Sequence, residues 1–316
     1  MMPSRIGSEA NDERRGGFAL LMVLLFLLVV ASVLTSLVLA ARTDLLIASN
    51  KFRQDRLAIL AEGLVTALAR EIASPASEIR NPAISFRSAP MRCQIGTLRI
   101  EARIQDQFGL ADLNTAGAGL LEAGFVALGL DRGKSASLAA TVIAFRRPPG
   151  TGGESSDIDT TMIAGGLKEG PFEAVEELYD FRDLRNMPAR QIVETFTIYG
   201  HRQTILGSRM PSRLAKVLPD APTGRYPFVS EGSDESSPES GSYRIDVSVR
   251  MANNPVTGFA GSVILATGND AGDFEVIERV TNPDFLPEAD SGFSGAIDCE
   301  ILFGDGVAAA LRAIES

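Results

Sequence analysis

The sequence has no tryptophan, one histidine and two cysteines among its 316 residues. Any Ser–His or Cys–His nucleophile system would depend entirely on the single histidine, His201. Two distant cysteines and one histidine do not have the spacing of a zinc site. A Gly-x-Ser-x-Gly elbow and a complete Gly-x-x-x-x-Gly-Lys-Ser/Thr phosphate-binding loop are also absent. These absences favour a protein that is not an enzyme and has no metal or cofactor.

Long uncharged stretches are scarce too, with one exception at residues 18–41. As an α-helix this stretch would span about 36 Å, which is enough to cross a bilayer core. Arg14 and Arg15 lie closest to it and favour a cytoplasmic N-terminus, so that the rest of the chain would be exported. A removed secretory signal is the alternative, since Ala40 and Ala41 could form part of a cleavage site.

Positive charge is in deficit: the net charge is −10, and all of it belongs to the part after residue 41. An acidic domain is a poor partner for nucleic acid or anionic lipid. Cys93 and Cys299 could form a disulfide in an oxidising periplasm, but sequence does not show that their backbones approach closely enough.

Acidic loop residues raise the question of calcium, which binds through carboxylate oxygens. The candidates are two pairs, Asp270 with Asp273 and Asp290 with Asp298. Ordinary solvated loop acids are the favoured interpretation, so calcium remains the weaker hypothesis.

Hydrophobic periodicity predicts a helix that continues past the membrane and then a sheet. Apolar residues recur at helical spacing from Leu57 through Leu60, Leu64 and Leu68 to Ile72, and Pro75 should end the helix. Strict alternation predicts half-buried strands, and turn residues bound the others. The expected strands are residues 98–105, 243–250, 259–267 and 274–280.

The part between the first strand and the other three has a helical pattern. Short helices are expected at residues 120–130, 135–145, 172–181 and 189–196, with Pro171 in the first turn of the third. Another short helix is expected at residues 308–314. The sequence therefore predicts an α+β fold, in which a long N-terminal helix packs on an antiparallel sheet that carries an inserted α-helical domain.

These patterns divide the chain into eight segments. They are an N-terminal arm (1–17), which the resemblance described next implies is a leader, a transmembrane helix (18–41), the periplasmic part of that helix (42–74), the first part of the sheet (75–108), the inserted domain (109–229), a linker (230–242), the rest of the sheet (243–281) and a C-terminal extension (282–316).

The N-terminal junction resembles a class III leader, the substrate of prepilin peptidase. Residues 14–18 read Arg-Arg-Gly-Gly-Phe and open directly into the apolar helix. The resemblance implies cleavage between Gly17 and Phe18 and N-methylation of Phe18. The alternative is a charged flank to an ordinary membrane anchor. Most pilins and pseudopilins carry Glu at the fifth mature position, where this chain has Met22, and the lack of that Glu is typical of the K subunit.

Two further stretches resemble the same family, the minor pseudopilin subunit K of type II secretion systems. Residues 106–116 read Asp-Gln-Phe-Gly-Leu-Ala-Asp-Leu-Asn-Thr-Ala, and residues 170–178, followed by 197–199, form the second block. The inserted helical domain is itself typical of that subunit. Two departures concern the insertion: Arg-Arg-Pro-Pro at 146–149 replaces an acidic, Trp-containing segment, and a second Asn-Thr-Ala-like turn is missing after Tyr199.

Residues 113–116 also resemble the entry to helix-hairpin-helix DNA-binding modules. The hairpin glycines that contact phosphate are missing, and the domain is acidic where a DNA-binding domain is basic. We expect Asn114 or Thr115 instead to cap the next helix.

The resemblance to subunit K implies a single-pass inner-membrane protein that caps the tip of the type II secretion pseudopilus and helps initiate its assembly. Its implied partners are other minor pseudopilins, prepilin peptidase and the inner-membrane platform. Two alternatives stay open: a minor pilin of a type IV pilus, and a signal-anchored periplasmic domain without a filament role.

Overall fold

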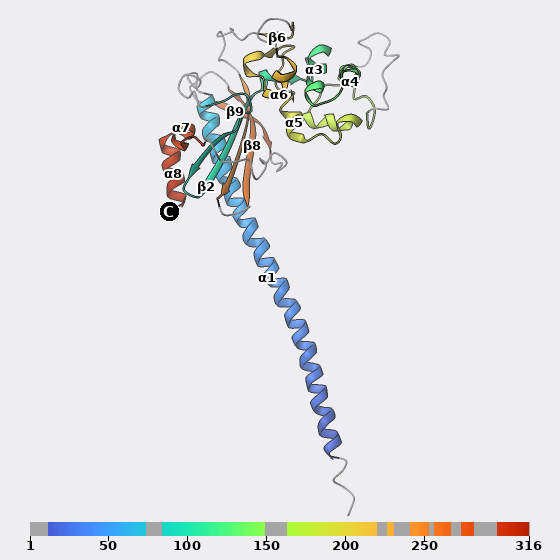
Figure 1. Cartoon of the computed structure of the whole chain (residues 1–316), viewed down its shortest axis with the longest axis vertical. Helices are drawn as coiled ribbons and strands as arrows, with labels where there is room; N and C mark the ends of the chain where they lie inside the picture. The colour runs from blue at the N-terminus through green and yellow to red at the C-terminus, as the bar shows by residue number, and fades with distance from the viewer. Residues whose placement is uncertain are drawn as a thin grey trace, which may run out of the picture. The chain divides into compact units, whose positions relative to one another are not determined.

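The computed structural model describes residues 12–73, 84–148, 163–219, 226–230, 241–252, 256–266, 273–280 and 296–315. The chain divides into two compact units, Met1–Gln54 and Asp55–Ser316. The first contains the N-terminal part of helix α1 (Asp12–Ile72), and the second contains all other elements (Figure 1). Several residues that the sequence singles out lie outside the described residues. They are Pro75, Asp270, Asp290, most of the expected linker, and the first part of the C-terminal extension.

The C-terminal part of α1 is amphipathic in the way that its sequence predicts. Leu57, Leu64, Leu68 and Ile72 are buried against the sheet, whereas Leu60 is only partly buried. Small residues fill the same face between them and allow the helix to lie close to the strands. The buried stripe therefore fixes the face of α1 that packs on the sheet.

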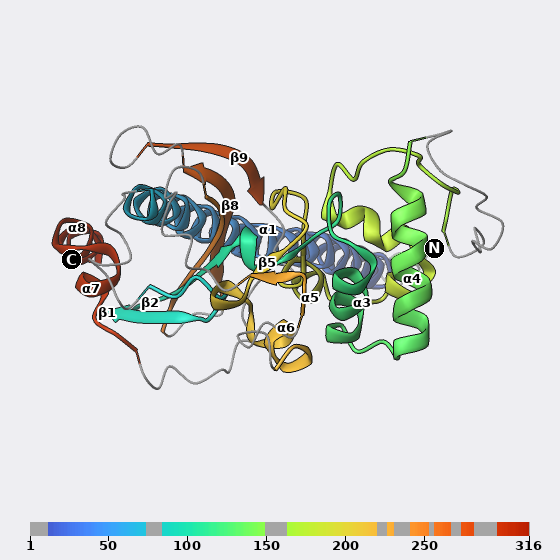
Figure 2. The same cartoon turned by 90° about the horizontal axis from the view of Figure 1, so that it is seen from above.

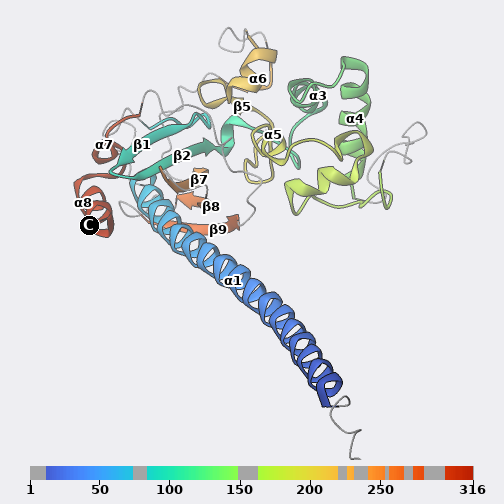
Figure 3. The ribbon, with the colours of Figure 1, turned by 60° about the horizontal axis from the view of Figure 1, so that its bottom comes forward.

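The sheet has five antiparallel strands in the order β1-β2-β7-β8-β9. Their bounds are β1 (Met91–Ile95), β2 (Leu98–Asp106), β7 (Ser242–Met251), β8 (Thr257–Ala266) and β9 (Phe274–Val280). Figure 3 shows these strands beside the C-terminal part of α1. The four expected strands are confirmed. The additional strand, β1, has only five residues, which is too short for alternation to stand out in the sequence.

One prediction about the sheet is wrong. Alternation in the two central strands predicts a polar face open to solvent, but Glu101, Gln105, Arg244 and Ser248 on that face are buried. Cross-strand pairs place Glu101 opposite Ser248 and Gln105 opposite Arg244. Glu101 forms ion pairs with Arg92 and Arg103, and Arg244 forms one with Asp246. The Gln105 amide donates to the carbonyl of Arg209 in the inserted domain. These partners compensate for the lost water.

The inserted domain lies between β2 and β7, which are neighbours in the sheet. Its helices are α3 (Ala118–Ala127), α4 (Arg132–Phe145), α5 (Ala189–Val193) and α6 (Ser212–Val217), with 3₁₀ helices η1 (Gln107–Gly109), η3 (Val175–Asp180), η4 (Arg182–Leu184) and η5 (Gly207–Arg209). Two short parallel pairs join them: β3 (Ala111–Asp112) with β4 (Phe196–Thr197), and β5 (Ile205–Leu206) with β6 (Val229–Ser230).

Two of the expected helices in the insertion differ from the prediction. The helix expected at residues 172–181 is only the 3₁₀ helix η3, and Pro171 is not in its first turn. The helix expected at residues 189–196 ends at Val193, and Phe196 lies in β4 instead. Residues 120–130 and 135–145 overlap α3 and α4, as predicted. Aromatic packing takes precedence over helical pattern here, since the rings of Phe145 and Phe172 lie 4.9 Å apart.

The chain ends in two helices, α7 (Cys299–Phe303) and α8 (Asp305–Glu315), and α8 includes the expected helix at residues 308–314. Both lie on the β1 side of the sheet (Figure 2). The structure thus confirms the predicted class: an α+β fold with a long N-terminal helix on an antiparallel sheet and an inserted, mostly helical domain.

Candidate assembly sites

The N-terminal helix contains the first candidate site. The helix Phe18–Ile72 is long and apolar enough to cross a membrane, by length and composition, and its most apolar window is not buried at all. The backbone of α1 is helical from Asp12, so the bond between Gly17 and Phe18 lies inside the helix. Phe18 and Met22 are exposed, at 63% and 51% of their full areas. Their side chains are therefore free for contacts with lipid or another subunit.

Exposed apolar side chains continue beyond the expected membrane span. Leu45, Phe52 and Ile59 are at least 64% exposed. They follow one another at intervals of seven residues, which is two helical turns, so they lie along one face of α1. We call these three residues the apolar stripe. Arg53 lies on another face, whereas Arg56 lies four residues after Phe52 and three before Ile59 and so borders the stripe. With this one positive charge beside it, the stripe is a feature suited to a partner helix.

The base of the inserted domain forms the second site, and a buried carboxylate organises it. Asp112 is 1% exposed. Its Oδ1 accepts hydrogen bonds from the backbone N–H groups of Asn114 (2.8 Å) and Thr115 (2.9 Å), and its Oδ2 accepts one from that of His201 (2.8 Å). His201 has a φ of +49°, in the left-handed region of backbone conformation. A charged acceptor with three N–H donors is a strong local constraint.

The predicted capping role of Asn114 and Thr115 is wrong. Helix α3 begins after Gly117, which makes no side-chain cap. The Asn114 amide instead binds the backbone of Phe172 twice: Nδ2 donates to its carbonyl (3.0 Å), and Oδ1 accepts from its N–H (2.7 Å). Thr115 Oγ1 donates to the carbonyl of Arg202 (2.6 Å). Both side chains thus join distant segments, because Asp112 has already closed the local turn.

The guanidinium of Arg146 completes the turn from the other side. It donates to the carbonyls of Leu113 and Ala116, the latter at 2.6 Å. Burial lowers the pKa of Arg146, while the nearby charge of Asp112 acts in the opposite direction. Arg146 belongs to the segment where this sequence departs from the K family, and it provides two structural hydrogen bonds there.

A third stretch meets the first through Gln107 and Thr197. Thr197 Oγ1 donates to Gln107 Oε1 (2.7 Å), and both residues are buried. The backbone N–H of Leu113 also donates to the carbonyl of Thr197 (2.8 Å). The three stretches that resemble subunit K, residues 106–116, 170–178 and 197–199, therefore lie in direct contact. We call this contact region the insertion base.

Charged residues connect the inserted domain to the sheet. Glu101 accepts from Arg92 Nε and from Arg103, both at 2.8 Å. Burial lowers the pKa of Arg103, as does the nearby Arg190, although Glu101 raises it. Arg103 also lies 4.0 Å from Glu194 of the inserted domain. The sheet and the insertion are thus joined through paired charges in addition to apolar contacts.

Asp106 lies at the point where the chain leaves the sheet. Burial raises the pKa of Asp106 to about 6, although the Phe108 N–H and the charge of Arg202 lower it. Its Oδ1 caps η1 by accepting from Phe108 N (2.9 Å). The Nε of Arg209 is 3.7 Å from its Oδ2, which is beyond hydrogen-bonding distance.

Tyr199 joins the insertion base to β9. Its hydroxyl donates to Glu278 (2.7 Å), and its carbonyl accepts from Ser242 Oγ (2.8 Å). Burial and the Glu278 carboxylate raise the pKa of Tyr199, so the hydroxyl keeps its proton and remains a donor.

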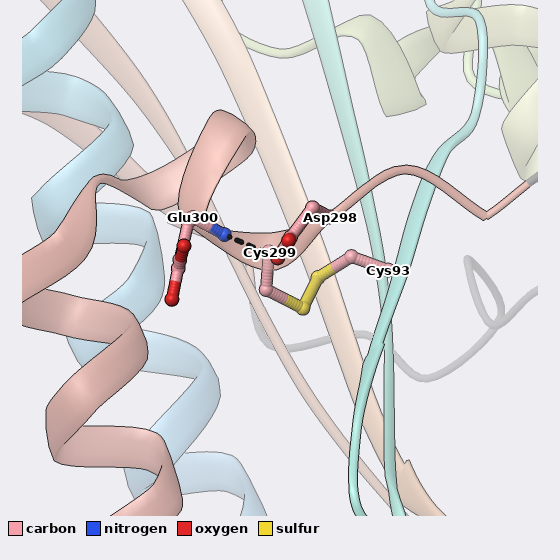
Figure 4. Close-up of a disulfide and its surroundings, with 4 residues drawn as sticks. All are labelled: Cys93, Asp298, Cys299 and Glu300. Carbon is pink, nitrogen blue, oxygen red and sulfur yellow. Dashed lines mark hydrogen bonds between the residues drawn. A yellow bond between two sulfur atoms is a disulfide. The ribbon is translucent and has the colours of Figure 1, made fainter.

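The structure also places the other residues that the sequence singles out. Cys93 and Cys299 form a disulfide with a Cα–Cα distance of 5.1 Å (Figure 4). Asp298 caps α7 by accepting from Glu300 N (3.1 Å). Within the described residues, no group of three His, Cys, Asp or Glu side chains could hold a metal ion. Calcium binding by Asp270 or Asp290 lies outside those residues and stays a hypothesis.

Sequence reasoning did not assign roles to Asp112, Gln107 or Thr197. The sequence does contain one signal for Asp112. An aspartate often forms an Asx turn, in which its carboxylate accepts a hydrogen bond from the backbone N–H two residues later, here that of Asn114. The contacts of Gln107 and Thr197 depend on residues 90 positions apart and have no local signal.

No protein-family model matches the chain, and no curated protein matches it. Among solved structures, it is similar to a chain in the crystal structure of the GspK-GspI-GspJ complex from the enterotoxigenic Escherichia coli type 2 secretion system. The two are 14% identical, with a TM-score of 0.47, over 77% of this chain and 99% of that one.

Proposed function

We propose that this chain is a minor pseudopilin of a type II secretion system, resembling subunit K, with a structural rather than a catalytic role. The observation that carries the proposal is the placement of the inserted domain. It lies between two neighbouring strands of a helix-and-sheet unit and is held by the insertion base. A filament subunit needs the helix and the sheet, whereas a bulky domain at one end of the sheet would prevent a further subunit from stacking there.

The N-terminal helix supplies the anchor in this proposal. Residues 18–41 would cross the inner membrane, with residues 1–17 in the cytoplasm and the folded unit in the periplasm. Prepilin peptidase would cut between Gly17 and Phe18, and the new N-terminus at Phe18 would be methylated. The apolar stripe would then pack against the helices of other minor pseudopilins, because these anchored helices rise from the same membrane.

A place at the tip follows from Met22. In a filament core, a carboxylate at the fifth mature position would pair with the N-terminal amine of a neighbouring subunit. An unpaired charge in lipid is costly, and a subunit with no neighbour above it would have no such amine to pair with. A methionine avoids this cost. The chain would thus cap the tip and help to initiate assembly on the inner-membrane platform.

A deletion strain tests the proposal against its alternatives. Loss of the chain should leave folded secretion substrates in the periplasm while surface pili remain. Loss of pili with intact secretion would instead indicate a type IV minor pilin. An unchanged strain would indicate a periplasmic domain without a filament role.

Complementation with point variants tests the apolar stripe. Ile59→Asp should fail to restore secretion, because it places a charge on the stripe. The Ile59 side chain is 70% exposed, so replacing it should change the stability of the fold little. Asn50→Asp is the matched control on the same helix and should restore secretion. Equal activity of the two variants would exclude a role for the stripe.

A further inference from the structure

The C-terminal helices form a separate attachment on the β1 edge of the sheet. We call residues 296–315 the C-terminal clip. Ile297 pairs with Cys93 in a parallel bridge, and its N–H donates to the carbonyl of Arg92 (2.8 Å). Among the described strands, β1 is terminal in the sheet, so the clip covers an edge that would otherwise present unpaired backbone groups (Figures 2 and 3).

Few apolar side chains hold the clip to the rest of the unit. Leu302, Ala308 and Leu311 are buried in the core between helix and sheet, and the partly buried Ile297, Phe303 and Val307 pack against it. Ile301 and Ile314 are more than half exposed. The ion pair between Arg312 and Glu300 joins α8 to α7 and so lies within the clip. Ordering about twenty residues costs more conformational entropy than these six apolar side chains can offset.

The disulfide supplies the missing attachment. Cys93 and Cys299 are both fully buried, and the bond joins residues 206 positions apart in the sequence. It connects the middle of β1 to the first residue of α7 (Figure 4). Closing so long a loop removes much of the entropy that docking of the clip would otherwise lose.

We propose that the disulfide is a redox-dependent lock for the clip. With the bond formed, the clip stays on β1 and the edge is covered. With the bond reduced, the clip detaches and the β1 edge opens, while the other four strands and the inserted domain stay folded. Reduction by a dithiol transfers two electrons: the S–S bond breaks, Cys93 and Cys299 become thiols, and the dithiol becomes a disulfide.

The β1 edge would be open before the disulfide forms and covered by the clip afterwards. If the folded unit is periplasmic, as the proposed function states, the clip is held only after export into an oxidising compartment. Until then the β1 edge is open to another strand, and afterwards it is closed. The lock itself depends on residues 91–95 and 296–315 and does not require the filament role.

Hydrogen exchange on the full-length chain in detergent micelles tests the lock. After dithiothreitol treatment, amides of the clip and of β1 should exchange at least tenfold faster than in the oxidised chain. Amides of β7 and β8 should keep their rates. Unchanged exchange in the clip would overturn the proposal, and so would equal loss of protection in all five strands, which would make the bond a staple of the whole fold.

Variants separate the bond from the apolar contacts. In Cys299→Ser, the Cys93 thiol should react with an alkylating reagent under native conditions, although it is fully buried when the clip is docked. Leu311→Ala keeps the disulfide and should leave the clip protected.

Dithiothreitol should change nothing further in the double variant Cys93→Ser/Cys299→Ser. If the clip opens on reduction in a chain that is not processed at Phe18, the lock stands and the proposed function fails.

Discussion

The side-chain amide of Asn114 pairs with the backbone of Phe172 at both its N–H and its carbonyl, across 58 positions of sequence. This double hydrogen bond replaces the backbone partners that Phe172 would have in a helix. It explains why the segment around Phe172 is extended and why η3 begins only at Val175. One side chain therefore sets the course of a distant segment at the insertion base.

Removing this amide should destabilise the inserted domain. Asn114→Ala leaves the two backbone groups of Phe172 without protein partners, and we expect the free energy of unfolding to fall by about 2–3 kcal/mol. Chemical denaturation followed by circular dichroism in detergent measures this change. Ser137→Ala, at an exposed position of α4, is the control and should stay within about 0.5 kcal/mol of the parent. A loss no larger than that of the control would mean that Asn114 does not hold the segment.

Asp106 should make stability depend on pH between about 4 and 6. Burial raises its pKa from 3.8 to about 6, so in that range the folded state binds a proton more tightly than the unfolded state does. Its contribution to stability is therefore largest near pH 4 and is lost as pH rises through 6. The expected loss across the window is about 2 kcal/mol.

Asp106→Asn isolates this contribution. The amide oxygen can still accept from Phe108 N, so the cap of η1 remains, while the titrating proton is gone. Denaturation midpoints measured at pH 4 and pH 6.5 should differ less in the variant than in the parent. An identical pH dependence in the two proteins would show that Asp106 titrates normally.

Gly258 marks a close approach of the sheet to α1. A Cβ at this position would lie 2.2 Å from the carbonyl carbon of Leu57 and 2.3 Å from the nitrogen of Ala58. Because both are backbone atoms, Gly258→Ala should push the strand away from the helix and cost about 2–3 kcal/mol of unfolding free energy. A thermal melt of the full chain reports this change.

Gly63 on the same helix is the matched control. A Cβ there would meet nothing within 4 Å, and Gly63→Ala should stabilise the protein by about 0.5–1 kcal/mol through helix propensity. If both alanine variants shifted the melting temperature in the same direction, the close approach at Gly258 would not be a constraint.

Processing at the N-terminus should depend on Gly17. A bulky side chain at the scissile bond would hinder a protease that works at the membrane surface, so Gly17→Val should retain the leader. Gly16→Val places the same side chain one residue earlier and should still be cut. Immunoblotting resolves the two forms, and equal processing of both variants would contradict the expected cut site.

Much of the fold could be predicted from the sequence because its signals are local. The alternation in residues 98–105 and 243–250 and the stripe from Leu57 to Ile72 each reflect one face packed on a core. β1 was missed because five residues carry too little pattern. The sequence also left open whether Cys93 and Cys299 form a disulfide, because their distance depends on where the C-terminal clip packs.

The candidate sites were harder to predict, for a physical reason. The side chains of Glu101 and Gln105 have the pattern of a solvent-facing strand, yet both are buried. Glu101 pairs with Arg92 of β1 and with Arg103 of its own strand, and the Gln105 amide donates to the carbonyl of Arg209 in the inserted domain. Asn114 has the local features of a helix cap, but Asp112 satisfies the turn and leaves Asn114 free to bind Phe172. Such contacts between distant residues have no local sequence signal.

The most direct test of the proposed function is the mature N-terminus, determined by mass spectrometry in cells with and without prepilin peptidase. The proposal predicts a chain that begins at N-methylated Phe18 and appears only when the peptidase is present. An intact leader in both strains, or a cut after Ala41, would contradict it and would indicate an ordinary anchored or secreted periplasmic domain.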